Sequence, residues 1–203
     1  MKIRNDAEQA ADREQVLISL RDLISQPTDT QVRPCPNCHV PVGAESMLST
    51  SSAASCSSQC QYAPRMMSSE PEKFPIEEAI APLVYALYTL RLLTPCWSCE
   101  GHLGEDGKIG KLPKVWFYCD SGFYPRMIAQ VIGNLQAHHK IGYSWMVRIL
   151  PFSQSTFSTT YSIEAGPSDA PLASLQKDVV VLGQHIRQQM LRLAHDYLKK
   201  EGG

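Results

Sequence analysis

Apolar residues recur at the spacing of an amphipathic helix in four segments of the chain, residues 6–25, 76–93, 124–138 and 175–197. In this pattern an apolar stripe faces the protein core while charged residues occupy the other side of the helix. Pro27 and Pro95 follow the first and second segments, and the residue before a proline is disfavoured in helical conformation. We therefore predict four helices, of which the one over residues 76–93 is buried.

Three shorter segments have the character of β-strands, residues 114–119, 143–149 and 157–163. The first is aromatic and β-branched, and the other two alternate between apolar and polar residues. A short connection through Pro151 joins the last two, which predicts that they pair. Helices and strands alternate from residue 76 onwards, so an α+β fold is expected, with an α/β layer domain of about three strands flanked by helices.

These elements and the composition between them divide the chain into four parts. We predict an N-terminal amphipathic helix in residues 1–30, a zinc-binding module in residues 31–66, a linker in residues 67–75, and the α/β domain in residues 76–203. The stretch leading to residue 75 is rich in proline and charge, which is typical of a linker.

Composition narrows the class of protein only a little. Of 203 residues, 43% are hydrophobic and 19% are charged, as in globular proteins. The formal charge of -1 gives no overall electrostatic attraction to nucleic acid or to an anionic membrane. The chain starts without the apolar core of a signal peptide. Its longest apolar stretch, residues 80–93, contains Arg91 and is shorter than the roughly 20 residues that span a bilayer. We expect a cytoplasmic protein without membrane contact.

Six of the seven cysteines form three close pairs, Cys35/Cys38, Cys56/Cys60 and Cys96/Cys99, and Cys119 stands alone. Close pairs and an odd total fit metal or redox chemistry better than a secreted disulfide framework, so a reducing compartment is expected.

The first two cysteine pairs, Cys35 with Cys38 and Cys56 with Cys60, have the spacing of a structural zinc site. A small-residue loop separates the pairs and lets four thiolates converge tetrahedrally on Zn²⁺. In a module of about thirty residues the metal takes the place of a hydrophobic core, so the free energy of metal binding supplies most of the free energy of folding. The alternatives left open are free thiols in a loop, and iron in place of zinc.

The run Cys35-Pro-Asn-Cys38-His-Val-Pro-Val, followed by Cys56-Ser-Ser-Gln-Cys60, resembles the small bacterial treble-clef zinc proteins that include the DNA gyrase inhibitor family. The resemblance implies zinc ligation by the four cysteines, a treble-clef or zinc-ribbon shape, and binding to protein or nucleic acid. Gln59 and the residues after Cys60 depart from the family pattern of a basic residue and then an acidic, apolar segment. Inhibition of gyrase is therefore not implied.

A second cluster, Cys96-Trp-Ser-Cys99-Glu100-Gly-His102, concentrates thiols, a carboxylate and an imidazole between the predicted central helix and a glycine-rich loop. One hypothesis is a second metal or redox site that joins Cys96, Cys99 and His102 to Cys119. Another is catalysis, with Cys99 as nucleophile, His102 as its base and Glu100 as orienting group or acid.

The third interpretation of this cluster is structural. Its cysteines then belong to the core, Gly101 supplies a turn with positive φ, and Glu100 and His102 tie the loop backbone together. The sequence alone leaves these three interpretations open.

Two functions follow from these motifs. The leading hypothesis is a zinc-binding, non-enzymatic adaptor that binds protein or nucleic acid, with a terminal helix available for self-association. The alternative is an enzyme with a thiol- or metal-dependent site at Cys99, Glu100 and His102. The three tryptophans, Trp97, Trp116 and Trp145, are candidates for base stacking, but core positions are expected for them.

Overall fold

A computed structural model describes residues 6–26, 33–34, 41–42, 73, 76–150, 159–167 and 169–201. The four cysteines of the predicted zinc module, Cys35, Cys38, Cys56 and Cys60, lie outside the described residues, as does most of the predicted module and linker. Within the described residues, the chain has an α+β fold.

Four helices form where the apolar pattern predicts them: α1 (Asp6–Ser25), α3 (Ala81–Tyr88), α4 (Phe123–Ala137) and α5 (Leu172–Glu201). The prediction for the central helix is wrong at both ends, because α3 spans only part of residues 76–93. The helix ends at Tyr88, and Thr89 Oγ1 donates a hydrogen bond to the carbonyl of Ala86. Arg91 then adopts a left-handed φ of 57°, so the chain does not continue as a helix. Leu90 and Leu93 are nevertheless buried. The apolar pattern therefore continues beyond the end of α3 at Tyr88.

The main sheet has four antiparallel strands in the order β3-β6-β8-β7. Its strands are β3 (Thr94–Cys99), β6 (Lys114–Cys119), β8 (Thr159–Ala165) and β7 (Trp145–Ile149). The three predicted strands and the pairing of β7 with β8 are confirmed. The prediction of about three strands is one too few for this sheet, because no strand was predicted for residues 94–99. Proline is rare in strands, so Pro95 argues against a strand in the sequence, although proline is tolerated on an edge strand such as β3. A bulge between Pro95 and Trp97 also breaks the alternation of apolar and polar residues.

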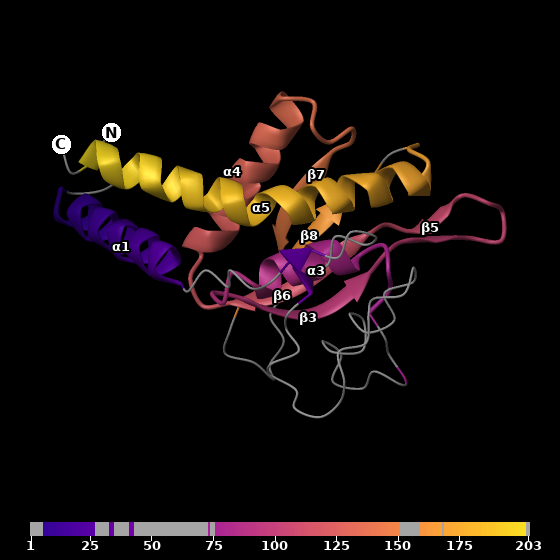
Figure 1. Cartoon of the computed structure of the whole chain (residues 1–203), viewed down its shortest axis with the longest axis horizontal. Coiled ribbons are helices and arrows are strands. Elements are labelled where there is room, and N and C mark those ends of the chain that lie inside the picture. The colour runs from indigo at the N-terminus through magenta and orange to yellow at the C-terminus, as the bar shows by residue number, and fades with distance from the viewer. Residues whose placement is uncertain are drawn as a thin grey trace.

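Two strand pairs lie outside this sheet. β4 (His102–Leu103) pairs with β5 (Ile109–Lys111), and their hairpin extends away from the body of the domain (Figure 1). β1 (Arg33–Pro34) pairs with β2 (Pro41–Val42) in antiparallel register. The glycine-rich loop was predicted without this β4–β5 pairing.

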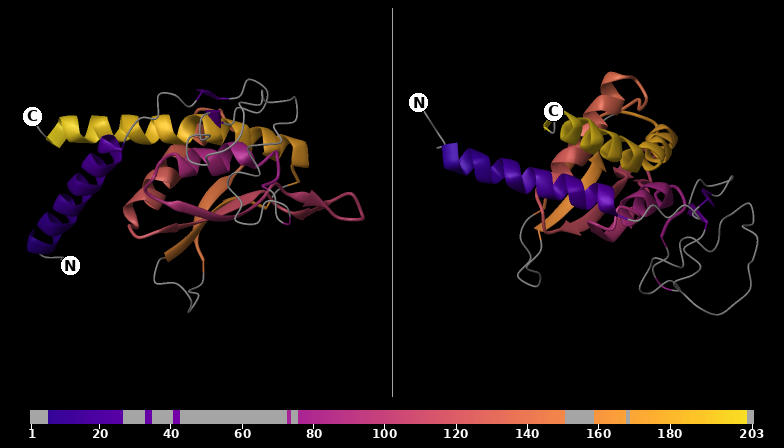
Figure 2. Two further views of the ribbon diagram at one scale, coloured as in Figure 1. Left: turned by 60° about the horizontal axis from the view of Figure 1, so that its bottom comes forward. Right: turned by 60° about the vertical axis from the view of Figure 1, so that its left-hand side comes forward.

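Helices α3, α4 and α5 cover one face of the main sheet (Figure 2). Val115, Phe117 and Ile163 are fully buried on that face and belong to one apolar cluster with residues of α3, α4 and α5. Trp145 is also buried there, as expected for it. Burial of this apolar surface is the main stabilising contribution, at about 25 cal/mol per Å².

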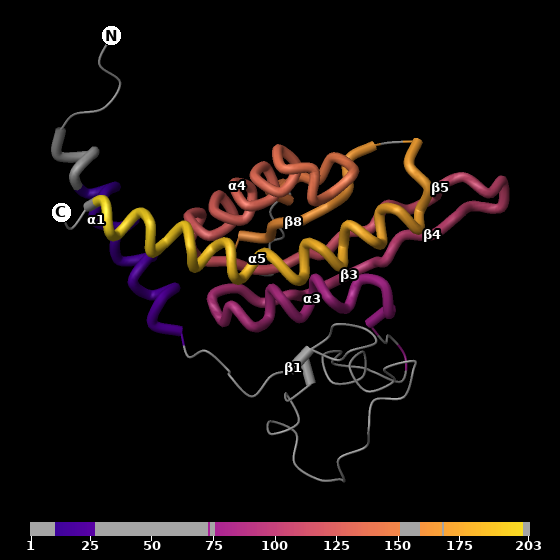
Figure 3. Tube along the Cα trace, turned by 45° about the horizontal axis from the view of Figure 1, so that its top comes forward, coloured from indigo at the N-terminus to yellow at the C-terminus, as the bar shows by residue number. Residues whose placement is uncertain are grey.

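Helix α5 lies across the sheet between α3 and α4, and its C-terminal half runs beyond the sheet beside α1 (Figure 3). Near its start, Asp178 accepts hydrogen bonds from the backbone N–H groups of Gly142 and Tyr143 and from the Trp145 indole. These bonds join α5 to the connection between α4 and β7. In the described ranges, no helix combines the length and apolar character needed to cross a membrane.

Candidate functional site

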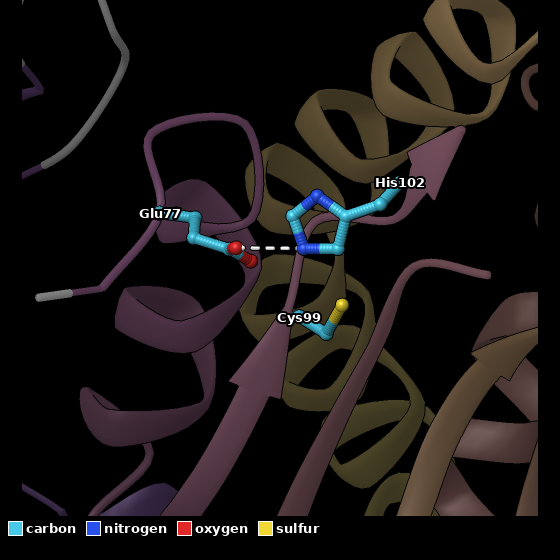
Figure 4. A group of neighbouring side chains, drawn as sticks. All are labelled: Glu77, Cys99 and His102. Carbon is cyan, nitrogen blue, oxygen red and sulfur yellow. Dashed lines mark ion pairs between the residues drawn. The ribbon is translucent and has the colours of Figure 1, made fainter. Parts of the chain in front are cut away.

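Three side chains from separate elements meet at the end of β3: Glu77 from the turn before α3, Cys99 from the last position of β3, and His102 from the first position of β4 (Figure 4). One ligand atom of each residue lies within 4.8 Å of the other two. Carboxylate oxygen, thiolate sulfur and imidazole nitrogen are the three kinds of side-chain ligand that zinc takes in proteins.

The turn between Cys99 and His102 aims both side chains at the same point. Gly101 has a φ of 87°, a left-handed conformation that glycine adopts without steric cost. A Cβ at this position would lie 2.6 Å from Leu172 Cδ1 and 2.9 Å from Pro113 Cδ. The sequence interpretation of Gly101 as a positive-φ turn is therefore confirmed.

The closest contact in the group joins Glu77 Oε1 to His102 Nε2 at 2.8 Å. Tetrahedral zinc with bonds of about 2.0–2.3 Å holds its ligand atoms roughly 3.3–3.8 Å apart. A metal ion would thus replace the direct contact between Glu77 and His102 and draw in the Cys99 sulfur. Small side-chain movements suffice, because all three ligand atoms already lie within 4.8 Å of one another.

Burial divides the group into an inner and an outer part. Cys99 is only 3% exposed, whereas the side chains of Glu77 and His102 are 33% and 46% exposed. The sulfur is therefore sheltered, and a fourth position on a bound ion would face the partly exposed side. Three protein ligands with one open position are typical of reactive zinc sites, while closed four-ligand sites are structural.

Hydrogen bonds hold the carboxylate of Glu77 in place. Its Oε2 accepts a hydrogen bond from the backbone N–H of Glu100 at 2.6 Å, which leaves Oε1 directed at His102. The carboxylate of Glu100 accepts from the backbone N–H of Ala79 at 2.9 Å, and the Glu100 carbonyl accepts from Gln176. Such outer contacts orient the ligands of metal sites.

Glu100 therefore ties two loops together, as the structural interpretation expected of it. The catalytic hypothesis gave Glu100 the role of orienting group or acid, but its carboxylate is bound to Ala79, and Glu77 is the carboxylate that contacts His102. No sequence signal singled out Glu77. Glu77 and Glu78 precede an apolar helix, where acidic residues ordinarily compensate the helix dipole.

The arrangement around His102 suits a metal better than a nucleophile with its base. In a nucleophilic triad one imidazole nitrogen faces the nucleophile and the other faces the orienting carboxylate. Figure 4 shows the Cys99 sulfur and the Glu77 carboxylate on the same side of the ring, with the second nitrogen on the far side. A carboxylate and a thiol on the same side of the imidazole can share one ion with its nearer nitrogen.

Cys119 does not join the group, so the hypothesis of a site that includes it is wrong. Cys99 is opposite Lys114 at one end of β6, and Cys119 is at the other end, roughly 16 Å away at about 3.3 Å per residue. Its thiol is hydrogen-bonded to the carbonyls of Ser121 and Leu92. Burial raises the pKa of the Cys119 thiol. Cys119 is a buried structural thiol.

Cys96 also lies apart from Cys99. It occupies the bulge of β3 and is exposed, and both cysteines are free thiols. Burial of the sulfur raises the pKa of Cys96, and a hydrogen bond with Tyr118 lowers it. The Cys-x-x-Cys spacing thus does not produce a pair of converging ligands, because three residues of extended strand separate the two side chains by about 10 Å.

Comparisons with protein-family models, with curated proteins and with solved structures found no match for this chain.

Proposed function

We propose that this chain is a zinc protein and that Glu77, Cys99 and His102 hold a metal ion in its α+β domain. The observation that carries the proposal is the convergence of three different ligand atoms within 4.8 Å around one buried sulfur. A mixed set of thiolate, imidazole and carboxylate favours zinc over magnesium or calcium, which prefer oxygen ligands throughout.

An open fourth position would give this centre a chemical use. Zinc bound by three protein ligands acts as a Lewis acid on a substrate oxygen, and it lowers the pKa of a bound water. A substrate would approach the ion from the side on which Glu77 and His102 are exposed. This proposal keeps the enzyme alternative, with Glu77 in the place that was first given to Glu100.

The number of zinc ions per chain tests the proposal. Cys99→Ser should contain one zinc ion fewer than the wild-type protein by elemental analysis, because the thiolate is the softest and most sheltered ligand. Cys96→Ser is the matched control, since it removes a thiol from the same strand outside the group. Equal zinc in wild type and Cys99→Ser would reject the centre.

The zinc module at Cys35, Cys38, Cys56 and Cys60 is a second proposal, with the binding of protein or nucleic acid as its function. The antiparallel pairing of β1 with β2, on either side of Cys35 and Cys38 in the sequence, supports it. Cys56→Ser should also lower the zinc content by one ion, and the effects of Cys56→Ser and Cys99→Ser should add. Unchanged zinc in Cys56→Ser would contradict the module while leaving the Glu77 centre standing.

A further inference from the structure

The face of the main sheet opposite the helices carries a row of aromatic and cationic side chains. The register of β3, β6, β8 and β7 puts five large residues on this outer face: Trp97, Lys114, Trp116, Tyr118 and Arg148. Neighbouring residues in register project to the same side of a sheet, so these side chains form one surface. Trp97 is 43% exposed and the Arg148 side chain is 60% exposed.

The aromatic residues of the outer face are arranged as platforms. The ring centroids of Trp97 and Trp116 lie 4.7 Å apart, and their planes are tilted by 40°. Tyr118 follows Trp116 on the same face, roughly 6.6 Å further along β6. A large exposed aromatic side chain on a sheet face costs hydrophobic free energy, which a ligand that covers it would recover.

Cations lie beside these platforms. The ammonium nitrogen of Lys114 is 5.7 Å from the centroid of the Trp97 ring, within range of a cation–π contact. Arg148 crosses to Glu164 with a distance of 2.7 Å, and the Ser162 hydroxyl donates to the same carboxylate. Arg148 thus offsets the negative charge of Glu164, and Lys114 supplies positive charge next to the Trp97 ring.

One polar atom of the outer face has no partner in the described part of the chain. The indole nitrogen of Trp116 is buried and has no hydrogen-bond acceptor there. A buried donor without an acceptor costs about 1–3 kcal/mol. An acceptor on a bound molecule would remove this cost after a small shift of the covering side chains.

We propose that the outer face binds single-stranded nucleic acid, with a base stacked on Trp97 and a neighbouring phosphate near Lys114. Four-stranded antiparallel sheets with aromatic residues on one face are among the platforms on which proteins stack unpaired bases. A duplex hides the faces of its bases and cannot use these rings. The proposal rests on the outer face alone and does not require the metal centre.

Fluorescence anisotropy of a labelled single-stranded oligothymidylate, titrated with the full-length protein, tests the proposal. Trp97→Ala should weaken binding roughly tenfold or more, as expected for the loss of one stacked base. Trp97→Phe should retain most of the affinity, because a phenyl ring still stacks. Lys114→Gln should lower the slope of log affinity against log salt by about 0.7, the value for one phosphate contact on a single strand.

Tyr197→Ala is the matched control, because it removes another exposed aromatic side chain, on α5 and far from the outer face. It should bind as the wild type does. Circular dichroism of each variant establishes that the sheet is intact. Absence of binding by the wild type would overturn the proposal. Affinity unchanged in Trp97→Ala would also overturn it, since the nucleic acid would then bind elsewhere, and so would equal affinity for duplex DNA.

Discussion

Oε1 of Glu77 lies 2.8 Å from Nε2 of His102, although helix α3 and strand β3 separate the two residues in the sequence. The contact closes the turn before α3 onto the turn after β3, and the sulfur of Cys99 lies beside it. The partly exposed side chains of Glu77 and His102 thus lie close to the buried thiol of Cys99. This relationship is the basis of the metal centre proposed above.

Gly101→Ala should destabilise the protein by about 1–3 kcal/mol, measured as the free energy of unfolding in urea. The substitution forces a side chain into a left-handed conformation, and its Cβ would clash with Leu172 and Pro113. Gly133→Ala is the control. It lies in α4, and apart from the backbone of that helix no atom comes within 4 Å of the new Cβ, so the substitution should be neutral or stabilise by up to about 1 kcal/mol.

Loss of stability in Gly101→Ala without loss of zinc would show that the turn matters to the fold but not to the ligands. The metal centre predicts that both fall together, because the turn directs Cys99 and His102 to the same point.

Asp178→Asn should lower the free energy of unfolding by about 1–3 kcal/mol. The carboxylate accepts three hydrogen bonds, two of them at Oδ2, and an amide turns an N–H group toward one set of these donors. Asp196→Asn, at an exposed position of the same helix, should be within about 0.5 kcal/mol of wild type. Equal effects of the two substitutions on the melting temperature would refute this role for Asp178.

The stability of the protein should fall at alkaline pH, and Cys119 should contribute to the fall. Burial raises the pKa of this thiol in the folded state, so the folded protein holds its proton at pH values where the unfolded chain has lost it. The contribution is complete below the unfolded pKa of roughly 8.5 and declines as the pH rises above it. Each such group adds at most about 1.4 kcal/mol per pH unit to the slope.

Urea unfolding of wild type and Cys119→Ala from pH 8 to pH 10, under reducing conditions, measures this contribution. The variant should be less stable at pH 8, where it lacks a buried side chain, and the difference between the two proteins should shrink as the pH rises. A constant difference over this range would mean that Cys119 does not titrate differently in the folded state. Cys96 and Tyr124, whose pKa values are also raised by burial, remain in both proteins.

Much of the fold could be predicted because its elements follow local patterns. Helices α1, α4 and α5 begin and end close to the predicted residues, and the alternation in β7 and β8 predicted their pairing. Strand β3 could not be predicted in this way. Its proline, its bulge and its mixed exposure remove the period of two, and only the partner strand β6 makes it a strand.

The candidate site was predicted in part. Only two residues separate Cys99 from His102 in the sequence, and their closeness follows from the turn at Gly101. Glu77 could not be found from the sequence, because its approach to His102 depends on how α3 packs against β3 and α5. The prediction that Cys119 joins this site is wrong. Cys99 pairs with Lys114 at one end of β6, whereas Cys119 lies at the other end of that strand.

The cobalt absorption spectrum of the full-length protein tests the central claim most directly. Co²⁺ in place of zinc reports each thiolate ligand as a charge-transfer band, so wild type should show a greater intensity per chain than Cys99→Ser, and His102→Ala should change the visible ligand-field bands. Cys96→Ser should match wild type. Identical spectra for wild type, Cys99→Ser and His102→Ala would contradict a metal centre at Glu77, Cys99 and His102.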